Sequence, residues 1–169
     1  MGAATMDEHV LFMNVDGPGA GRHALDALRQ AHEDGDIRLR EATVISRDAE
    51  GNLEFPDSED HTGTARGFAV GGLVGGLVGI LGGPLGIMIG FGAGGLIGGA
   101  HDAREATAAN AAVEMLAAEV PPGSTVLIAE VAEDRPELVD GALEPYGDAV
   151  ERYPAEGVRK AVEAAIEDR

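Results

Sequence analysis

The sequence predicts an α+β fold made of two strand–helix–strand units, with a glycine-rich insert between them and a helix after them. Three observations lead to this prediction. Short apolar runs that are typical of buried strands alternate with segments that carry apolar residues at helical spacing. The order strand, helix, strand occurs twice along the chain. Between the two occurrences lies an uncharged stretch, residues 67–100, that is laddered with glycine.

The first unit begins with the run HVLFMNV, in which both alternating sets of side chains are largely apolar, as in a buried strand. The helix that follows carries Ala24, Leu25, Leu28 and Ala31 on one face. Gly35 stands just after it, where a left-handed residue ends many helices. The predicted elements are a strand at 9–15, a turn at 16–21, a helix at 20–33, a strand at 39–47, a turn at 48–52 and a short strand at 53–55.

The second unit repeats this order after the break Pro121-Pro122-Gly123. Asp134 and Glu137 have the spacing of a capping box, and Pro136 suits a first helical turn. The predicted elements are a strand at 124–131, a helix at about 134–144 and a strand at 149–153.

Two such units in tandem predict a ferredoxin-like βαββαβ sandwich, a four-stranded antiparallel sheet with two helices on one face. The predicted organisation is a split ferredoxin-like domain at 8–55 and 121–153, an insert at 56–120 with a hairpin at 67–100 and a return helix, and an amphipathic tail helix at 155–168. The tail places Val158, Ala161, Val162, Ala165 and Ile166 on one face. That face needs a docking surface, either the open face of the sheet or another subunit.

The insert carries two unbroken ladders of glycine at four-residue spacing, and residues four apart stack along one helix face. Each ladder therefore forms a smooth groove that another backbone can approach closely. The ladder positions, which we interpret as assembly residues, are Gly67, Gly71, Gly75, Gly79 and Gly83, followed by Gly82, Gly86, Gly90, Gly94 and Gly98. Glycine costs about 1 kcal/mol per helical position relative to alanine, so such a helix needs close packing or a bilayer to form.

The arms at 67–82 and 84–100 are short for a bilayer, because each would be roughly 25 Å long against a hydrocarbon core of about 30 Å. The link between them carries no polar side chain that would lie in water on the far side. These two observations favour a hairpin that is buried within a protein assembly. Insertion into a bilayer is the alternative.

Three stretches of the chain together resemble a known family, the uncharacterised proteins grouped as domain of unknown function twelve-sixty-nine. The stretches are ALDALRQAHEDGDIRLREATVISRDAEGNL, TGTARGFAVGGLVGGLVGILGGPLG and PPGSTVLIAEVAEDRPELVDGALEPYG, within a resemblance that covers about residues 8–153. The family is often labelled as predicted membrane proteins. The resemblance implies a ferredoxin-type domain with a glycine-zipper insert, and it brings no catalytic or binding residue with it.

Composition excludes several function classes. The chain has no cysteine, which excludes disulfides and thiolate metal sites, and its net charge of −18 argues against nucleic acid as a partner.

The glycine-containing turn at 16–21 lacks the glycine order and the lysine of a phosphate-binding loop. His61 and His101 flank the hairpin, either as a solvated polar collar or, with Asp60 or Asp102, as a metal site or pH switch.

The resulting prediction is a non-enzymatic, acidic protein that assembles with itself into a homo-oligomer or filament through its glycine-zipper hairpins. We expect no catalytic, cofactor or metal site, and a cytoplasmic location without a secretory signal. One alternative is a membrane-associated protein whose hairpin enters the bilayer in an envelope or stress role. Another is an enzyme or ligand-binding module with a pocket on the sheet face, lined by residues such as Phe12, Asn14 and Thr43.

Overall fold

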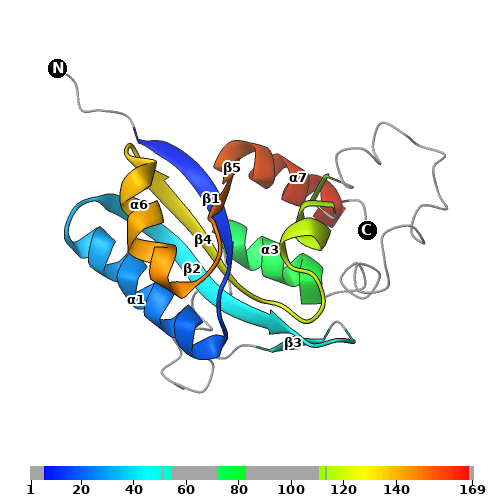
Figure 1. Ribbon diagram of the computed structural model, residues 1–169. Helices are drawn as coiled ribbons and strands as arrows, with labels where there is room; N and C mark the ends of the chain where they lie inside the picture. The colour runs from blue at the N-terminus through cyan, green and yellow to red at the C-terminus, as the bar shows by residue number, and fades with distance from the viewer. Residues whose placement is uncertain (1–5, 51, 55–71, 83–110, 113, 168–169) are drawn as a thin grey trace.

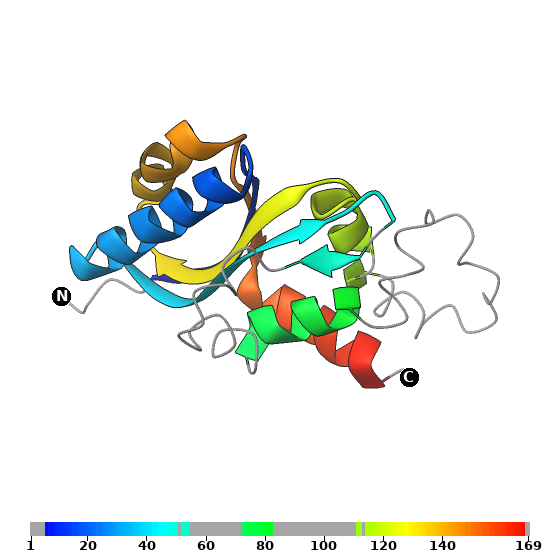
Figure 2. The same cartoon turned by 90° about the horizontal axis from the view of Figure 1, so that it is seen from below.

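The computed structural model describes residues 6–50, 52–54, 72–82, 111–112 and 114–167. This part of the chain forms a five-stranded antiparallel sheet with helices on both faces (Figures 1 and 2), so the α+β prediction is confirmed. The elements are β1 (Asp7–Asn14), α1 (Pro18–Glu33), β2 (Ile37–Arg47), β3 (Leu53–Glu54), α3 (Gly72–Gly82), β4 (Thr125–Glu133), α6 (Pro136–Leu143), a 3-10 turn (Glu144–Tyr146), β5 (Glu151–Pro154) and α7 (Ala155–Glu167).

The strand order is β3-β2-β4-β1-β5, and every neighbouring pair is antiparallel. Helix α1 therefore carries the chain from β1 past β4 to β2, and α6 carries it from β4 past β1 to β5. Both helices pack on the same face of the sheet, as Figure 2 shows. The apolar residues predicted to line α1 are buried there, and so are Leu11 and Met13 of β1.

The opposite face of the sheet is also covered, which the two-helix expectation did not include. Helices α3 and α7 lie side by side on it, and the helical residues 111–112 and 114–119 share the same core. The tail helix thus docks on the sheet of its own chain, through Val158, Val162 and Ala165. Phe12 and Thr43, expected to line a pocket on this face, are only 1% and 4% exposed.

Several local expectations can be compared with the backbone. Gly35 has φ +84° and follows α1, so the predicted helix end is confirmed. The turn after β2 is also confirmed, because the N–H of Asp48 donates to the carbonyl of Asn52 at 2.9 Å and β3 pairs back on β2. The strand predicted at 149–153 begins two residues later, at Glu151.

The capping box predicted from Asp134 and Glu137 was wrong. Helix α6 begins at Pro136 with Arg135 as its N-cap, and no side chain caps it. Asp134 therefore lies one residue before the cap, and Glu137 falls at the second helical position instead of the third. The proline fixes the start of the helix, because its ring presets a helical φ and its missing N–H costs nothing there.

Candidate functional site

Helix α3 is the part of the glycine-rich hairpin that the structure describes, and it contains Gly75, Gly79 and Gly82 of the predicted assembly positions. Its larger side chains are buried in the core under the sheet: Leu73, Val74, Leu77, Val78, Ile80 and Leu81. His61 and His101 lie outside the described residues. So do the other predicted assembly positions, which are Gly67, Gly71, Gly83, Gly86, Gly90, Gly94 and Gly98.

Two rows of glycine run along α3, and they meet different surroundings. The first, Gly72 and Gly76, we call the inner row. A Cβ atom at Gly76 would lie 2.8 Å from a methyl carbon of Val162 on α7, closer than side chains pack. The absence of a side chain at this position therefore lets α7 approach the backbone of α3, which is the use that the sequence predicted for the glycines.

The second row, Gly75 and Gly79, we call the outer row. Gly75 is half-buried and Gly79 is exposed. Among the described residues, no atom lies within 4 Å of the place that a Cβ at Gly79 would occupy. Helix α3 thus buries its leucines, valines and isoleucine in the core, and Gly79, which has open space beside it among the described residues, belongs to the longer predicted ladder.

The N-terminus of α3 is held by a carboxylate from the neighbouring strand β2. Glu41 Oε1 accepts a hydrogen bond of 2.8 Å from the backbone N–H of Val74. The first N–H groups of a helix have no partner within the helix, so this contact satisfies one of them. Gly72 has φ +75° and lies directly against the Glu41 carboxylate, where a Cβ would collide with it. The left-handed φ favours glycine at this position, whereas the collision involves only the flexible end of the Glu41 side chain.

A second carboxylate, Glu130 of β4, lies opposite Glu41 in the register of the two strands. It is only 5% exposed, and it forms an ion pair with Arg159 of α7, with a distance of 3.4 Å from Nη2 to Oε2. Together these groups line a groove of about 520 Å³ between α3, α7 and the sheet. The groove is bordered by Arg40, Glu41, Gly72, Leu73, Gly76, Glu130, Arg159, Val162 and Glu163.

Burial and neighbouring charges in this groove raise the pKa of Glu41. Burial raises the pKa of the Glu41 carboxyl above its ordinary value of 4.5, and the negative charge of Glu130 raises it further. The hydrogen bond from Val74 acts in the opposite direction, because it stabilises the ionised form. The two carboxylates therefore repel each other at neutral pH, and Arg159 is the cation placed beside them.

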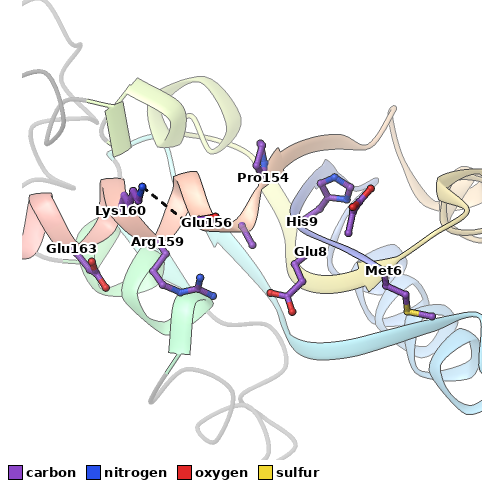
Figure 3. Close-up of a pocket in the computed structure, with 10 residues that line it drawn as sticks. Met6, Glu8, His9, Pro154, Glu156, Arg159, Lys160 and Glu163 are labelled. Carbon is purple, nitrogen blue, oxygen red and sulfur yellow. Dashed lines mark ion pairs between the residues drawn. The ribbon is translucent and has the colours of Figure 1, made fainter. Parts of the chain in front are cut away.

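A second groove, of about 600 Å³, lies at the beginning of α7 beside the first residues of β1 (Figure 3). It shares Arg159 and Glu163 with the first groove. Figure 3 shows that Arg159 and Lys160 leave α7 on different sides. Lys160 lies 3.9 Å from Glu156 on the outer surface of the helix, and its side chain is 75% exposed. Of these two cations, only Arg159 reaches toward the sheet.

The other face of the sheet carries a buried ion pair at its end. Glu133 of β4 is 1% exposed and receives Nε of Arg152 at 2.7 Å and Nη2 at 3.2 Å. Arg152 also donates to Asp140 and to the carbonyl of Pro136 in α6, and His9 Nδ1 lies 3.0 Å from the Glu133 carboxylate. This cluster ties β1, β4, β5 and α6 together, so we assign it to stability.

Sequence reasoning missed Glu41, Glu130 and Arg159 as parts of a site. A signal was present, because Glu130 interrupts the apolar run of its strand and charged residues are rarely buried without a partner. The partners themselves could not be read from local spacing, since Glu41 and Val74 are far apart in the chain. Among the described residues, no group of three or more His, Cys, Asp or Glu could hold a metal ion.

Within the described ranges, no helix has both the length and the hydropathy that a membrane span requires. Comparisons with known proteins gave no match to a family model, to a curated protein or to a solved structure.

Proposed function

We propose that this protein is a non-enzymatic structural protein that assembles with itself through its glycine-bearing helices, as a homo-oligomer or a filament in the cytoplasm. The observation that carries the proposal is the arrangement of α3. Its large apolar side chains are buried under the sheet, whereas Gly79 of the outer row has no described atom within 4 Å of the place that a Cβ would occupy. A helix packs closely against another where small residues face it.

The contact between α3 and α7 supports the same reading. At Gly76 a neighbouring helix already approaches closely enough that a Cβ would collide with Val162. Glycines at four-residue spacing repeat this geometry along a helix. The outer row has the same spacing as the inner row, so a helix from a second copy would find the same kind of surface there.

The proposal includes a finer description of the fold. The strand order β2-β4-β1-β5 with two helical crossovers on one face supports a ferredoxin-like βαββαβ core. In this description the glycine hairpin is an insert between the second and third strands of the core, and α7 is an addition at its end. We retain the resemblance of the sequence to domain of unknown function twelve-sixty-nine as part of the proposal.

Membrane insertion is the competing role for the hairpin. The burial of α3 argues against it as the resting state, because α3 could enter a bilayer only by uncovering the sheet residues beneath it. Val10, Phe12 and Ile128 would then be exposed to water. Exposing apolar surface costs about 25 cal/mol per Å², which the bilayer would have to offset.

The test is a bulky substitution on the outer row. Gly79→Leu adds a side chain where no described atom lies within 4 Å, so the fold should tolerate it. Ala118→Leu is the matched control, because Ala118 is an exposed helical residue on a different segment. We expect sedimentation velocity in detergent-free buffer to show an oligomer for the wild type and the control, and a smaller species for Gly79→Leu.

A wild-type monomer at all accessible concentrations would contradict the proposal. Co-sedimentation with liposomes, measured on the same samples, separates the two roles. Binding to vesicles that is lost in Gly79→Leu, from a protein that is monomeric without lipid, would favour the membrane role instead.

A further inference from the structure

Helix α7 covers Gly76 of the inner row, so its position decides what else can reach this part of α3. Val162 of α7 fills the space beside Gly76, and Leu73, Gly76 and Val162 border the same groove. Helix α7 is the last element of the described chain and follows β5 directly. The pairing of β5 with β1 ends at Pro154, so α7 can move away without breaking a strand pair.

Among the described residues, one side-chain ion pair joins α7 to the sheet. Arg159 reaches Glu130 at 3.4 Å, and its side chain is 46% exposed while that of Glu130 is 7% exposed. The buried apolar residues of α7 are four small or medium side chains, Ala155, Val158, Val162 and Ala165. In the closed arrangement the Glu130 carboxylate therefore depends on Arg159, because a buried charge without a partner is costly.

Glu130 also connects α7 to the beginning of α3. It lies opposite Glu41, and Glu41 holds the N–H of Val74. Arg159 pairs with Glu130 and so offsets part of the repulsion between the two carboxylates. Without it, that repulsion acts in full on the carboxylate that caps α3. Three successive interactions therefore link the position of α7 to the capping of α3. They are the ion pair of Arg159 with Glu130, the repulsion between Glu130 and Glu41, and the hydrogen bond from Val74 to Glu41.

We propose that α7 is a releasable clasp over α3, fastened by the ion pair between Arg159 and Glu130, and that its release opens the inner glycine row to a helix from a second copy of this chain. The inference rests on the proposed self-assembly for its second half only. The fastening of α7 by Arg159 is a property of the single chain and can be measured without assembly.

The experiment uses a thiol probe, which is simple here because the chain has no cysteine. Val162→Cys, a change of similar size, places a thiol at a residue that is 5% exposed on the inner side of α7. In this background Arg159→Ala is compared with Lys160→Ala. The two changes remove one positive charge from neighbouring positions of the same helix, and only Arg159 contacts Glu130.

We expect maleimide to label the thiol roughly tenfold faster in Arg159→Ala than in Lys160→Ala, because removing the partner of a buried carboxylate favours the open state. Equal rates in the two variants would overturn the clasp. A thiol introduced by Ala31→Cys, in α1 on the opposite face, reports global unfolding. If Arg159→Ala accelerated that thiol to the same degree, the effect would be general destabilisation and the clasp would again be overturned.

The same two charge variants, made in the cysteine-free wild-type background, test the consequence for assembly. Arg159→Ala should assemble more than Lys160→Ala, because release of α7 uncovers Gly76 of the inner row. Faster labelling of Arg159→Ala in a protein that stays monomeric throughout would support the clasp and contradict the proposed self-assembly.

Discussion

Arg152 and Glu133 form a side-on ion pair, in which Nε and Nη2 of the guanidinium meet the two carboxylate oxygens at 2.7 and 3.2 Å. The side chain of Glu133 is completely buried, and that of Arg152 is 18% exposed. Burial alone lowers the pKa of Arg152, but the hydrogen bonds and charges of Glu133 and Asp140 outweigh burial and raise it.

Arg152→Ala should therefore destabilise the protein strongly, by about 3–5 kcal/mol, because it leaves the buried Glu133 carboxylate without its main cation. Arg40→Ala is the matched control. Arg40 pairs with Glu8 at 2.8 Å, but both side chains are more than a third exposed, so that pair should contribute about 0–1 kcal/mol. Urea unfolding followed by circular dichroism measures both. Similar losses in the two variants would contradict the assignment.

The α+β fold could be predicted because its strands carry short-range signals. The run of Val10 to Met13 is apolar on both faces, and Gly35 and Pro136 mark helix ends through their own backbone preferences. The contacts of the candidate site could not be predicted in this way. Glu41 reaches Val74, and Arg159 reaches Glu130, only after the sheet has formed and both helices have packed on it.

The sequence also could not predict which glycine row of α3 faces the rest of the fold. Periodicity places Gly75 and Gly79 on one stripe and Gly72 and Gly76 beside it. It does not say which stripe faces the sheet, because α3 is apolar all around apart from its glycines. The answer depends on where α7 docks, and two docking surfaces for the tail were equally consistent with the sequence.

Two alanine substitutions in α3 should have opposite effects on stability. Gly72→Ala forces a side chain into a left-handed conformation, which costs about 1–2 kcal/mol, and it also collides with Glu41. Gly79→Ala should raise the free energy of unfolding by about 0.5–1 kcal/mol, since alanine favours the helix and the space beside it is open. The urea unfolding midpoint of each variant is compared with that of the wild type. A shift of the same sign in both variants would contradict the different surroundings described for the two glycine rows.

Substitutions of Glu41 should separate its charge from its hydrogen bond. Glu41→Gln keeps an oxygen that can accept from Val74 and removes the repulsion with Glu130. Glu41→Ala removes both, and the lost cap should cost about 1 kcal/mol. At neutral pH we therefore expect Glu41→Gln to be at least as stable as the wild type and Glu41→Ala to be less stable than either.

The pH dependence of these variants follows from the raised pKa of Glu41. A raised pKa means that the folded state binds the proton more tightly than the unfolded state. The resulting stabilisation is fully present below the ordinary pKa of 4.5 and is lost as the pH rises through the raised value. The advantage of Glu41→Gln over the wild type should thus grow from pH 4 to pH 7, and an advantage that shrinks over this range would contradict the raised pKa of Glu41.

The last prediction concerns Tyr153 of β5, whose hydroxyl donates a hydrogen bond of 2.6 Å to Glu119 and whose ring meets Phe12 edge-on at 5.6 Å. Burial raises the pKa of the Tyr153 phenol, and the hydrogen bond to Glu119 and the charges of Glu119 and Glu151 raise it further, to about 12. The stability that this implies is complete below pH 10, the ordinary value, and is lost between pH 10 and about 12. Tyr153→Phe keeps the ring contact and should cost about 1 kcal/mol below pH 10. In a Tyr146→Phe background, where Tyr153 is the only tyrosine, ultraviolet titration should show the phenolate forming near pH 12 in the folded protein, and a midpoint near 10 would show that the contact with Glu119 is not formed.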